Sequence, residues 1–421
     1  MESSENIVEG GNKRLNPCNQ IFKEVLFMRT KSIGKNEKFT EPQKDKITIH
    51  VAHKLSEKRE IYKFRYQVFV KEMGISVKNA DRKTRMIVDA MDEFSIQLYA
   101  QDDAGIIGTL RAMFGNVEQF PQELSRIFCM EKFQSLSKEN KLCLTTKLAV
   151  TKKYRGSQVL YMLMAKVYEL FRENKAKFVF SGCNPYLIPL YDQMGFRRRF
   201  ARNFTDYGYG LLVPLVMVVE DVDHFRAVKS PFYRAARVLE NDNQSGQVFF
   251  RAFPEAAKCV NSQLINQENL WTLLTQILGN YPLLVMPLLL GLTEDEAAAF
   301  LHSGAVMSCF IDDVIICPGQ VSNEIFLLLT GALLKVRSKA TRLIRPGQSF
   351  GGIGLITPRP QYETISALAD SEVLVISRQS FEKFCRRYPN AGEQIIQNLL
   401  YMENYAEHQD GNQNIKGGVV S

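Results

Sequence analysis

The chain has 421 residues, 45% of them hydrophobic and 23% charged, which is typical of globular proteins and too much chain for one ordinary hydrophobic core. We therefore expect two domains and a linker. The net charge of +8 suits an anionic substrate or carrier protein. Basic residues form only short clusters such as residues 152–155, so we expect no nucleic-acid partner.

Cysteine and histidine spacing indicates neither a metal site nor a disulfide framework. The closest two of the eight cysteines are Cys309 and Cys317, and only His50 and His53 lie close together among the five histidines. We expect reduced thiols in a cytoplasmic protein and no bound metal. The longest apolar run, residues 281–292, contains two prolines and is shorter than the roughly 20 residues of a membrane span, so we expect none.

The N-terminal third begins with a polar arm and continues with strands and one helix. Residues 1–44 are polar and charged and are expected to form the arm. Residues 57–73 have apolar side chains at helical spacing and predict an amphipathic helix. Strands are predicted at residues 46–52, 95–100 and 106–114, the last two joined by a tight turn at 102–105.

A strand, a basic loop and a long helix follow one another between residues 143 and 174. The strand is predicted at 143–150 and the helix at 158–174. The first backbone N–H groups of such a helix are unpaired and point outward, so this junction predicts an anion site. Further elements are a strand at 178–183, a helix at 187–194 ended by Gly195, and a strand at 210–219 interrupted by Pro214.

The C-terminal half changes from helical to strand-rich character. Helices are predicted at residues 232–239 and 264–278, with a polar loop at 241–246. Many short strands between residues 305 and 377 predict a small β-barrel or jelly roll, closed by helices at 379–386 and 390–403. The expected segments are an arm (1–44), a first domain (45–221), a helical connector (222–280), a second domain (281–405) and a flexible tail (406–421).

Four motifs of the first domain occur in the order and spacing of one enzyme superfamily. They are FRYQVF at 64–69, VDAMDEFS at 88–95, GIIGTLR at 105–111 and KLAVTKKYRG at 147–156. With them, residues 46–220 resemble the GNAT acyltransferases, and within that superfamily the acyl-homoserine-lactone synthases and the related N-acyl amino acid synthases. The resemblance implies an α+β fold, with a mixed sheet covered by helices on both faces.

The resemblance implies an acceptor site around a pair of acids. We expect Asp89, Asp92 and Arg111 to form a charged cluster at one edge of the sheet, since buried charges must be paired. The acidic pair would help bind the amine-bearing acceptor, and the alternative is a structural ion-pair network. Arg65 and Phe69 would lie beside the carrier or the acceptor, while the alternative for Arg65 is a surface charge on its helix.

The proton-transfer groups are less well defined by the sequence. Glu72, which follows Phe69 on the same helix, is a candidate general base, and a bound water is the other. Tyr191 can protonate a leaving thiolate or can serve only in packing. Leu144 stands where lactone synthases carry a glutamate, three residues before the basic position that Lys147 matches. This difference argues against S-adenosylmethionine and favours a plain amino acid as acceptor.

The acyl carrier is expected at the anion site. The residues assigned to the carrier or its phosphopantetheine arm, besides Arg65 and Phe69, are Leu148, Val150, Arg155, Gly156 and Ser157. Most members of the superfamily have glycines where this chain has Gln158 and Leu160, and those glycines let the loop close on the pyrophosphate of coenzyme A. The leaner loop favours a long-chain acyl carrier protein over an acyl-CoA as co-substrate.

The second domain contains PLLLGLTEDEAAAF at 287–300, DDVIICPGQVSNEIFLLLTGALLKV at 312–336 and a longer motif at 345–381, with turns at Gly319, Gly331, Gly347 and Gly351. With these motifs it resembles the cyclic-nucleotide-binding domain over residues 282–400. The family binds the ribose with a glutamate and the cyclic phosphate with an arginine, and these positions are Gly352 and Gln361 here. Losing the charged partner of a phosphate weakens binding about ten- to hundredfold. We therefore expect a degenerate pocket, formed by Phe350, Gly351, Gly352, Ile353, Gln361 and Thr364.

We expect an N-acyltransferase that moves a long-chain acyl group from an acyl carrier protein or acyl-CoA thioester to the amine of a small amino acid-like acceptor. The second domain would regulate or scaffold it. No cofactor would be permanently bound, binding of a cyclic nucleotide is doubtful, and homodimerisation is left open. One alternative is a cyclic-nucleotide-regulated, acetyl-CoA-dependent protein acetyltransferase. The other is a non-catalytic sensor or adaptor in which both sites have decayed.

Overall fold

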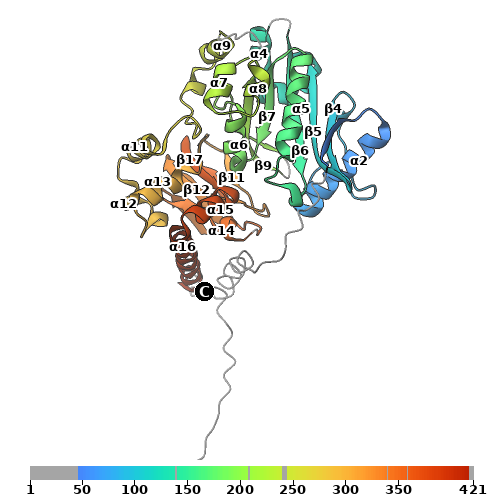
Figure 1. The fold of residues 1–421 in the computed structure, drawn as a ribbon. Helices are drawn as coiled ribbons and strands as arrows, with labels where there is room; N and C mark the ends of the chain where they lie inside the picture. The colour runs from blue at the N-terminus through green and yellow to red at the C-terminus, as the bar shows by residue number, and fades with distance from the viewer. Residues whose placement is uncertain are drawn as a thin grey trace, which may run out of the picture. The chain divides into compact units, whose positions relative to one another are not determined.

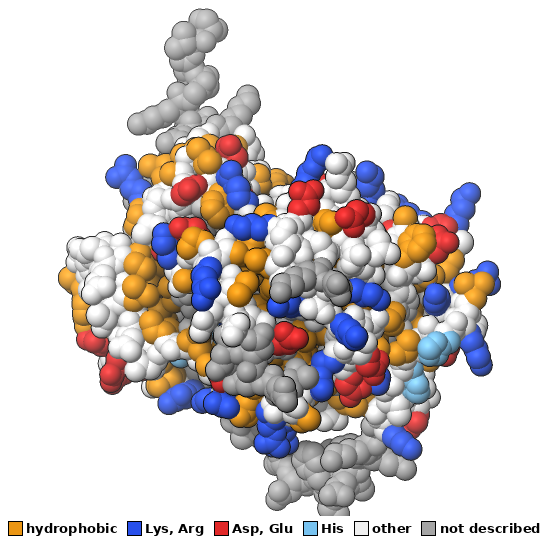
Figure 2. Space-filling model, turned by 90° about the horizontal axis from the view of Figure 1, so that it is seen from above, with side chains coloured by type: hydrophobic (Ala, Val, Ile, Leu, Met, Phe, Trp, Pro, Cys, Tyr) orange, Lys and Arg blue, Asp and Glu red, His pale blue; other side chains and the backbone are white. Residues whose placement is uncertain are grey.

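The computed structural model describes residues 46–416 apart from 138–139, 207–208, 239–243, 339 and 358, and gives only the backbone of 404–416. The arm expected at residues 1–44 lies outside the described residues. None of the described helices combines the length and the hydropathy that crossing a membrane requires. On the face shown in Figure 2, Lys and Arg side chains are interspersed with acidic and apolar ones and form no continuous basic surface.

Within the described residues, the first domain is built on a seven-stranded sheet in the order β1-β4-β5-β6-β7-β9-β8. Neighbouring strands are antiparallel except β6 and β7, which are parallel because α5 crosses over between them. The strands are β1 (Thr48–Val51), β4 (Ile96–Asp102), β5 (Gly105–Gly115), β6 (Lys141–Val150), β7 (Ala176–Cys183), β8 (Phe204–Asp206) and β9 (Gly210–Val218). Two short strands, β2 (Ala80–Asp81) and β3 (Met86–Ile87), form a separate hairpin.

Both faces of this sheet are covered, because its strands carry apolar side chains in both directions. In β7, Phe178 and Phe180 belong to one core and Val179 to the other. The first core contains Phe133 of α4, and the second contains Leu163 of α5. The helices of this domain are α2 (Leu55–Tyr66), α3 (Gln122–Ile127), α4 (Met130–Ser137), α5 (Val159–Glu173) and α6 (Ile188–Met194), and Figure 1 shows α5 running along the sheet.

Two predicted elements differ in detail from the sequence-based expectation. The helix expected at residues 57–73 changes at Tyr66 into a π-helix, η1 (Gln67–Glu72). Strand β9 is not interrupted at Pro214, which pairs with Gly182 of β7. On the other side of β9, the pairing with β8 ends at Leu212. The next residue of β9 that is paired on this side is Val216, which pairs with Arg197. The missing N–H of the proline falls in the gap between these two partners, so the strand loses no ladder hydrogen bond.

The second domain consists of two four-stranded antiparallel sheets, in the orders β10-β17-β12-β15 and β11-β16-β13-β14. Every strand predicted there is present, and β15, a two-residue strand, was not predicted. The strands are β10 (Ala305–Cys309), β11 (Val314–Ile316), β12 (Glu324–Thr330), β13 (Leu333–Arg337), β14 (Ala340–Ile344), β15 (Ser349–Phe350), β16 (Thr364–Ala367) and β17 (Ser371–Ser377). The predicted α+β fold with a C-terminal jelly-roll-type barrel is confirmed.

Helices surround the barrel and fill its flank with an apolar core. The Thr293 side chain caps α13, as the acids that follow it predict. The helices are α11 (Gln267–Leu278), α12 (Pro282–Val285), α13 (Glu294–His302), α14 (Ile353–Ile356), α15 (Arg378–Arg387) and α16 (Pro389–Lys416). Helix α16 therefore continues into the residues that we expected to form a tail.

The connector packs on both domains and is not an extended linker. Its helices are α7 (Val222–Ala227), α8 (Tyr233–Ala236), α9 (Gln244–Ala252) and α10 (Pro254–Ala257). A polar loop was predicted at residues 241–246, but helix α9 begins at Gln244, so the prediction is wrong for 244–246. The helix forms because Phe249 and Phe253 pack into the core on one face of the sheet. Arg198 pairs with Asp192 and also donates to the carbonyls of Val260 and Val306. Arg198, the middle residue of the basic run 197–199, thus connects the first domain with the connector and the second domain.

Candidate active site

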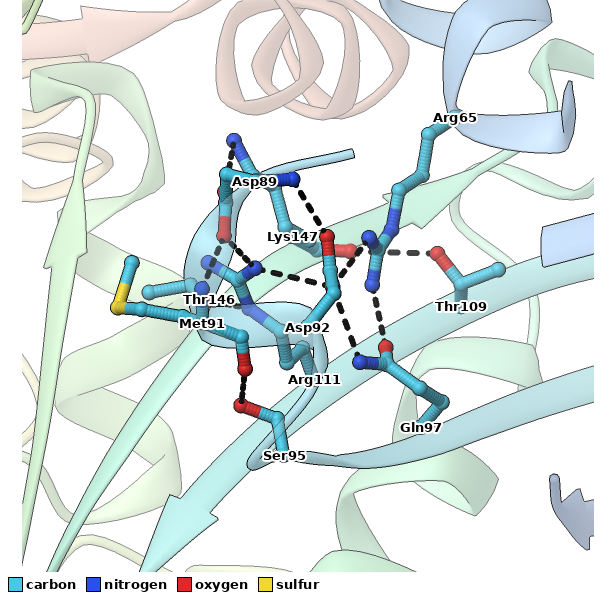
Figure 3. A network of polar contacts seen from close by, with 10 residues as sticks. All are labelled: Arg65, Asp89, Met91, Asp92, Ser95, Gln97, Thr109, Arg111, Thr146 and Lys147. Atoms are coloured by element: carbon cyan, nitrogen blue, oxygen red, sulfur yellow. Dashed lines mark hydrogen bonds and ion pairs between the residues drawn. The ribbon is translucent and has the colours of Figure 1, made fainter. Parts of the chain in front are cut away.

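A buried ion-pair cluster lies where η2 (Ala90–Asp92) meets β4, β5 and β6 (Figure 3). Arg65 of α2 is fully buried, and its Nη1 donates to Asp92 Oδ1 at 2.8 Å. Its Nη2 donates to Gln97 Oε1, and Gln97 Nε2 donates to Asp92 Oδ1 at 3.0 Å. Burial lowers the pKa of the Arg65 guanidinium, and the Asp92 carboxylate opposes that shift. Arg65 is therefore not the surface charge of the alternative interpretation.

Arg111 connects the two acids to β6. Its Nη1 contacts Asp89 Oδ1 at 2.5 Å and Asp92 Oδ1 at 3.0 Å, and its Nε donates to Thr146 Oγ1 at 2.9 Å. Burial would raise the pKa of Asp92, but the attraction of Arg65 and Arg111 outweighs it and holds that pKa below the usual range. The sequence prediction that Asp89, Asp92 and Arg111 lie together thus agrees with the geometry.

The spacing of the two acids has a local cause. Asp89 Oδ1 accepts from the backbone N–H of Met91 at 3.0 Å, and Asp92 Oδ2 accepts from the backbone N–H of Asp89 at 2.9 Å. This reciprocal capping box turns both carboxylates toward the same side of the chain. The side chain of Asp92 is 2% exposed and that of Asp89 is 14% exposed, so only Asp89 keeps access to a ligand.

A β-bulge brings a third cation to the cluster. Arg111 pairs with Thr146 and Thr109 with Ala149, so β6 has one extra residue between these pairs. Lys147 in the bulge has φ +54°, and its Nζ lies 3.8 Å from Asp89 Oδ2. Burial, followed by repulsion from Arg111, lowers the pKa of Lys147. The five charged residues of the cluster are thus three cations against two anions, which leaves one positive charge without a counterpart inside it.

Tyr209, at the turn between β8 and β9, covers Lys147. The ammonium lies 5.4 Å from the centre of the Tyr209 ring, and Phe69 packs against the same ring edge-on at 5.4 Å. The Tyr209 hydroxyl is buried with no hydrogen-bond partner. Burial raises the pKa of Tyr209, so this hydroxyl stays protonated and can donate a hydrogen bond.

Sequence reasoning missed Gln97 and Tyr209 and used Lys147 only as a marker of position. For Gln97 a signal existed, because it is a polar residue directly opposite Arg111 in the β4–β5 ladder. For Tyr209 there was none, since only the fold of the β8–β9 hairpin carries it over a lysine more than 60 residues earlier in the chain.

The predicted carrier loop lies between β6 and α5 and holds the predicted base. Glu72 Oε2 pairs with Arg155 Nη2 at 3.2 Å and accepts from the backbone N–H of Lys152 at 3.1 Å. The contacts of Glu72 are thus with the carrier loop, and none of those seen joins it to Asp89 or Asp92. Arg155 Nε also donates to the Val150 carbonyl at 3.0 Å, which fixes the loop against the end of β6.

The end of β6 that leads into this loop is open toward β7. The two strands pair only from Lys141 to Leu144, and the predicted carrier residues Leu148 and Val150 lie beyond that point. Unpaired backbone groups of this kind can accept an extended arm that carries amide groups, as phosphopantetheine does. Tyr191, in contrast, is 5% exposed and packs against Phe196 at 5.2 Å, in the apolar core between β7 and α6.

The cassette of the second domain contains apolar contacts where a nucleotide would need polar ones. A Cβ at Gly352 would lie 2.6 Å from Leu399 Cδ2 and 2.9 Å from Ile325 Cδ1, so there is no room for a glutamate. Phe350 stacks on Phe326 at 5.1 Å, while Gly351, with φ +71°, ends β15. Ile353 begins α14 and Thr364 begins β16.

Gln361 is 7% exposed, and its side-chain nitrogen has no hydrogen-bond partner. Its backbone is tied instead to the loop between β11 and β12, because its N–H donates to the Gln320 carbonyl at 2.8 Å. Among the six predicted pocket residues there is thus no charged partner for a phosphate.

Two clefts are prominent among the described residues. One has a volume of about 620 Å³ and is lined by charged residues at the end of α5, including Glu169 and Arg172. The other, of about 530 Å³, lies along residues 76–82. Neither is an apolar tunnel that could hold a long acyl chain. The apolar cluster beside the bulge, which includes Phe64, Phe69 and Ile87, is packed.

Family models match both domains. Residues 60–213 match the model described as N-acyl amino acid synthase FeeM. Residues 311–388 match the model of the cyclic nucleotide-binding domain. Together with the charged cluster, these matches confirm the resemblance and identify the type of each domain.

Individual relatives are more distant. The Pycsar effector protein BcPycTIR of Burkholderia cepacia is 29% identical over 113 residues, which are 26% of this chain and 37% of the relative. The solved structure of FeeM, an N-acyl amino acid synthase from uncultured soil microbes, is 11% identical with a TM-score of 0.36 and covers 47% of this chain and 99% of its own. The Catabolite Activator Protein of Thermus thermophilus is 21% identical, with a TM-score of 0.27, 31% of this chain covered and 63% of its own.

Proposed function

Because residues 60–213 form an acyltransferase domain of the N-acyl amino acid synthase FeeM type, we propose that this chain transfers a long-chain acyl group from a carrier thioester to the amine of an amino acid. The observation that carries the proposal is the charged cluster of Asp89, Arg111 and Lys147 beside the open edge of β6. It offers a carboxylate for an ammonium group next to a path for an extended carrier arm.

In this proposal Asp89 orients the acceptor amine. It is the one carboxylate of the pair with remaining exposure, and it accepts only one of its hydrogen bonds from the backbone. After the ammonium loses a proton to water, the amine nitrogen attacks the thioester carbonyl carbon. The C–N bond forms and the C–S bond breaks, the nitrogen gives up a second proton to water, and the leaving thiolate takes a proton from solvent. Backbone N–H groups along the unpaired edge of β6 stabilise the developing oxyanion.

Lys147 and Tyr209 would hold the carboxylate of the acceptor. The cluster has one positive charge in excess, and the Tyr209 hydroxyl lacks a partner. Asp206, exposed on β8, attracts Lys147 more weakly than Asp89 does. A free amino acid supplies both an ammonium group for Asp89 and an anion for Lys147, whereas a simple amine or a protein lysine supplies no anion.

An acyl carrier protein is the donor that we favour. A Cβ at Gly156 of the carrier loop would lie 3.1 Å from Nε2 of Gln379, so this part of the loop is already covered on one side. The single phosphate of a phosphopantetheine arm needs less space there than the diphosphate of coenzyme A. The described cysteines are all free, which supports a reducing compartment such as the cytoplasm as the place of the reaction.

The second domain, in our proposal, does not bind a cyclic nucleotide in the manner of its family. Leu399 occupies the space beside Gly352, where the ribose contact would be, and Gln361 offers an amide instead of a guanidinium. The domain acts as a scaffold for the first.

Product analysis by mass spectrometry tests the donor and the acceptor together. The full chain is incubated with long-chain acyl carrier protein or the matching acyl-CoA, and with an amino acid, its amide or its decarboxylated amine. We expect N-acyl amino acid with the carrier protein, and at least tenfold less product from the amide and the amine. Absence of product from every donor, or acetylation of protein lysines from acetyl-CoA instead, would contradict the proposal.

A further inference from the structure

The second domain contacts the acyltransferase site at two separate elements. One apolar core runs from β9, through Leu211 and Val213, to Ile315 and Ile316 of β11. A shared core of this kind fixes two domains relative to each other, unlike the polar interfaces of domains that move freely. In Figure 1 the barrel lies against the end of the sheet where α6 and β9 are drawn. The barrel therefore contributes side chains to that end of the first domain.

The first contact is at the hairpin that carries Tyr209. Gly210, the residue after Tyr209, has φ +74°, and a Cβ there would overlap the side-chain amide of Gln320. Gln320 is held in place because its Oε1 accepts from the backbone N–H of Cys317 at 3.2 Å. On the other side, Asn184 Nδ2 donates to the Tyr209 carbonyl at 2.7 Å. The hairpin turn over Lys147 is thus clamped between the two domains.

The second contact is at the carrier loop. Gln379, at the start of α15, lies against Gly156, where a Cβ would be 3.1 Å from its Nε2. The carrier loop therefore has a neighbour from α15 of the second domain.

Both contacts originate in segments that are bonded to the cassette. The Gln361 N–H donates to the Gln320 carbonyl at 2.8 Å, and the Gly319 N–H donates to the Gln361 carbonyl at 2.8 Å. Arg378, the neighbour of Gln379, donates through Nε to the Gly354 carbonyl of α14 at 2.9 Å. The cassette positions of the barrel thus hold the two glutamines that touch the acyltransferase site.

We propose that the second domain completes the acyltransferase site, with Gln320 and Gln379 as positioning residues. Gln320 holds the hairpin that places Tyr209 over Lys147, and so acts on the acceptor. Gln379 holds the carrier loop at Gly156, and so acts on the acyl carrier. This inference rests on the proposed function for its kinetic readout, but not for its structural readout.

The kinetic experiment compares three alanine variants of the full chain. Gln320→Ala is expected to raise KM for the amino acid about three- to tenfold and to leave KM for the acyl carrier protein unchanged. Gln379→Ala is expected to raise KM for the acyl carrier protein about three- to tenfold and to leave KM for the amino acid unchanged. Gln397→Ala removes an exposed glutamine of α16 and is the control, with no change in either constant. Equal changes in both constants for both variants, or no change, would overturn the inference.

A second measurement does not need activity. Amide hydrogen exchange of the full chain is followed in the segments 209–212 and 152–158. Gln320→Ala should speed exchange in the first segment and Gln379→Ala in the second, each without affecting the other segment. If the wild type forms no product but exchange responds in this way, the proposed function fails and the positioning stands. If product forms but exchange and KM do not respond, only the inference fails.

Discussion

The charged cluster of the first domain and the cassette of the second domain differ in how their buried polar positions are occupied. In the first, Arg65 and Asp92 are almost fully buried and are paired with each other and with Gln97. In the second, the position of the family's glutamate is Gly352, packed by Leu399, and that of its arginine is Gln361. Both regions match a family model, yet only the first contains a cluster of paired buried charges.

The difference shows what a family match establishes and what it leaves open. A fold is maintained by its apolar core, and the barrel has one that includes Leu399 and Ile325. Ligand binding depends instead on a few polar groups, whose burial is unfavourable unless they are paired. Where the ligand is no longer bound, apolar side chains can fill its place without loss of the fold. In the cassette apolar side chains surround Gly352, whereas the buried charges of the cluster are paired.

The largest expected effect is on stability, at the buried ion pair. Arg65→Met would remove one of the two arginines that pair with Asp92 and the donor to the buried Gln97 Oε1, and should destabilise the protein by about 3 kcal/mol. Urea-induced unfolding of the wild type and the variant measures the difference. The exposed Arg59→Met on the same helix is the control, with an expected change below about 0.5 kcal/mol. A change of less than about 1 kcal/mol for Arg65→Met would mean that the cluster is not a buried network.

The next effect is on acceptor recognition. Lys147→Met removes the cation in excess and should raise KM for the amino acid about ten- to hundredfold, because a charge-assisted contact is lost. KM for the corresponding amide should change little. Steady-state kinetics with both acceptors measures this, and Lys71→Met on the exposed side of η1 is the matched control. Equal losses for acid and amide would refute the role of Lys147.

A smaller effect concerns pH and the contact between the domains. Burial raises the pKa of Glu324 to about 7. Because this pKa is above that of the unfolded chain, the stabilising contribution of the protonated form is complete at low pH and is lost as pH rises toward 7. Glu324→Gln should therefore become more stable relative to the wild type between pH 5 and pH 8, by about 2 kcal/mol. Thermal unfolding at both values measures it, and a constant difference would contradict the assignment.

The smallest effect is expected at the cassette. Gln361→Arg restores the cation of the family but should give no measurable binding of a cyclic nucleotide, because Leu399 still fills the space beside Gly352. Isothermal titration calorimetry of the wild type and the variant with cyclic AMP and cyclic GMP tests this. Binding at micromolar concentration by either protein would show that the cassette is functional after all.

The sequence predicted the features that depend on local patterns. The apolar alternation placed the strands, and the motif with Asp89 and Asp92 placed these two acids together with Arg111. The motifs around Arg65 and Arg111 identified the type of the first domain. Each of these patterns extends over only a few residues.

What the sequence did not predict depends on distant segments. Tyr209 reaches Lys147 only because β8 and β9 fold back over the end of β6. Leu399 meets Gly352 only because α16 packs on α14. Glu72, a candidate base by its place on the helix, is engaged by Arg155 of the carrier loop. None of these contacts can be inferred from a hydrophobic period or a residue spacing in the sequence.

The central claim is that the charged cluster is an acceptor site for acyl transfer, and one measurement tests it most directly. Product from long-chain acyl carrier protein and a pool of amino acids is measured by mass spectrometry for the wild type, Asp89→Asn and Asp103→Asn. We expect N-acyl amino acid from the wild type and from Asp103→Asn, whose carboxylate lies in the exposed β4–β5 turn. We expect at least a hundredfold less from Asp89→Asn. Equal product from Asp89→Asn and Asp103→Asn would contradict the account.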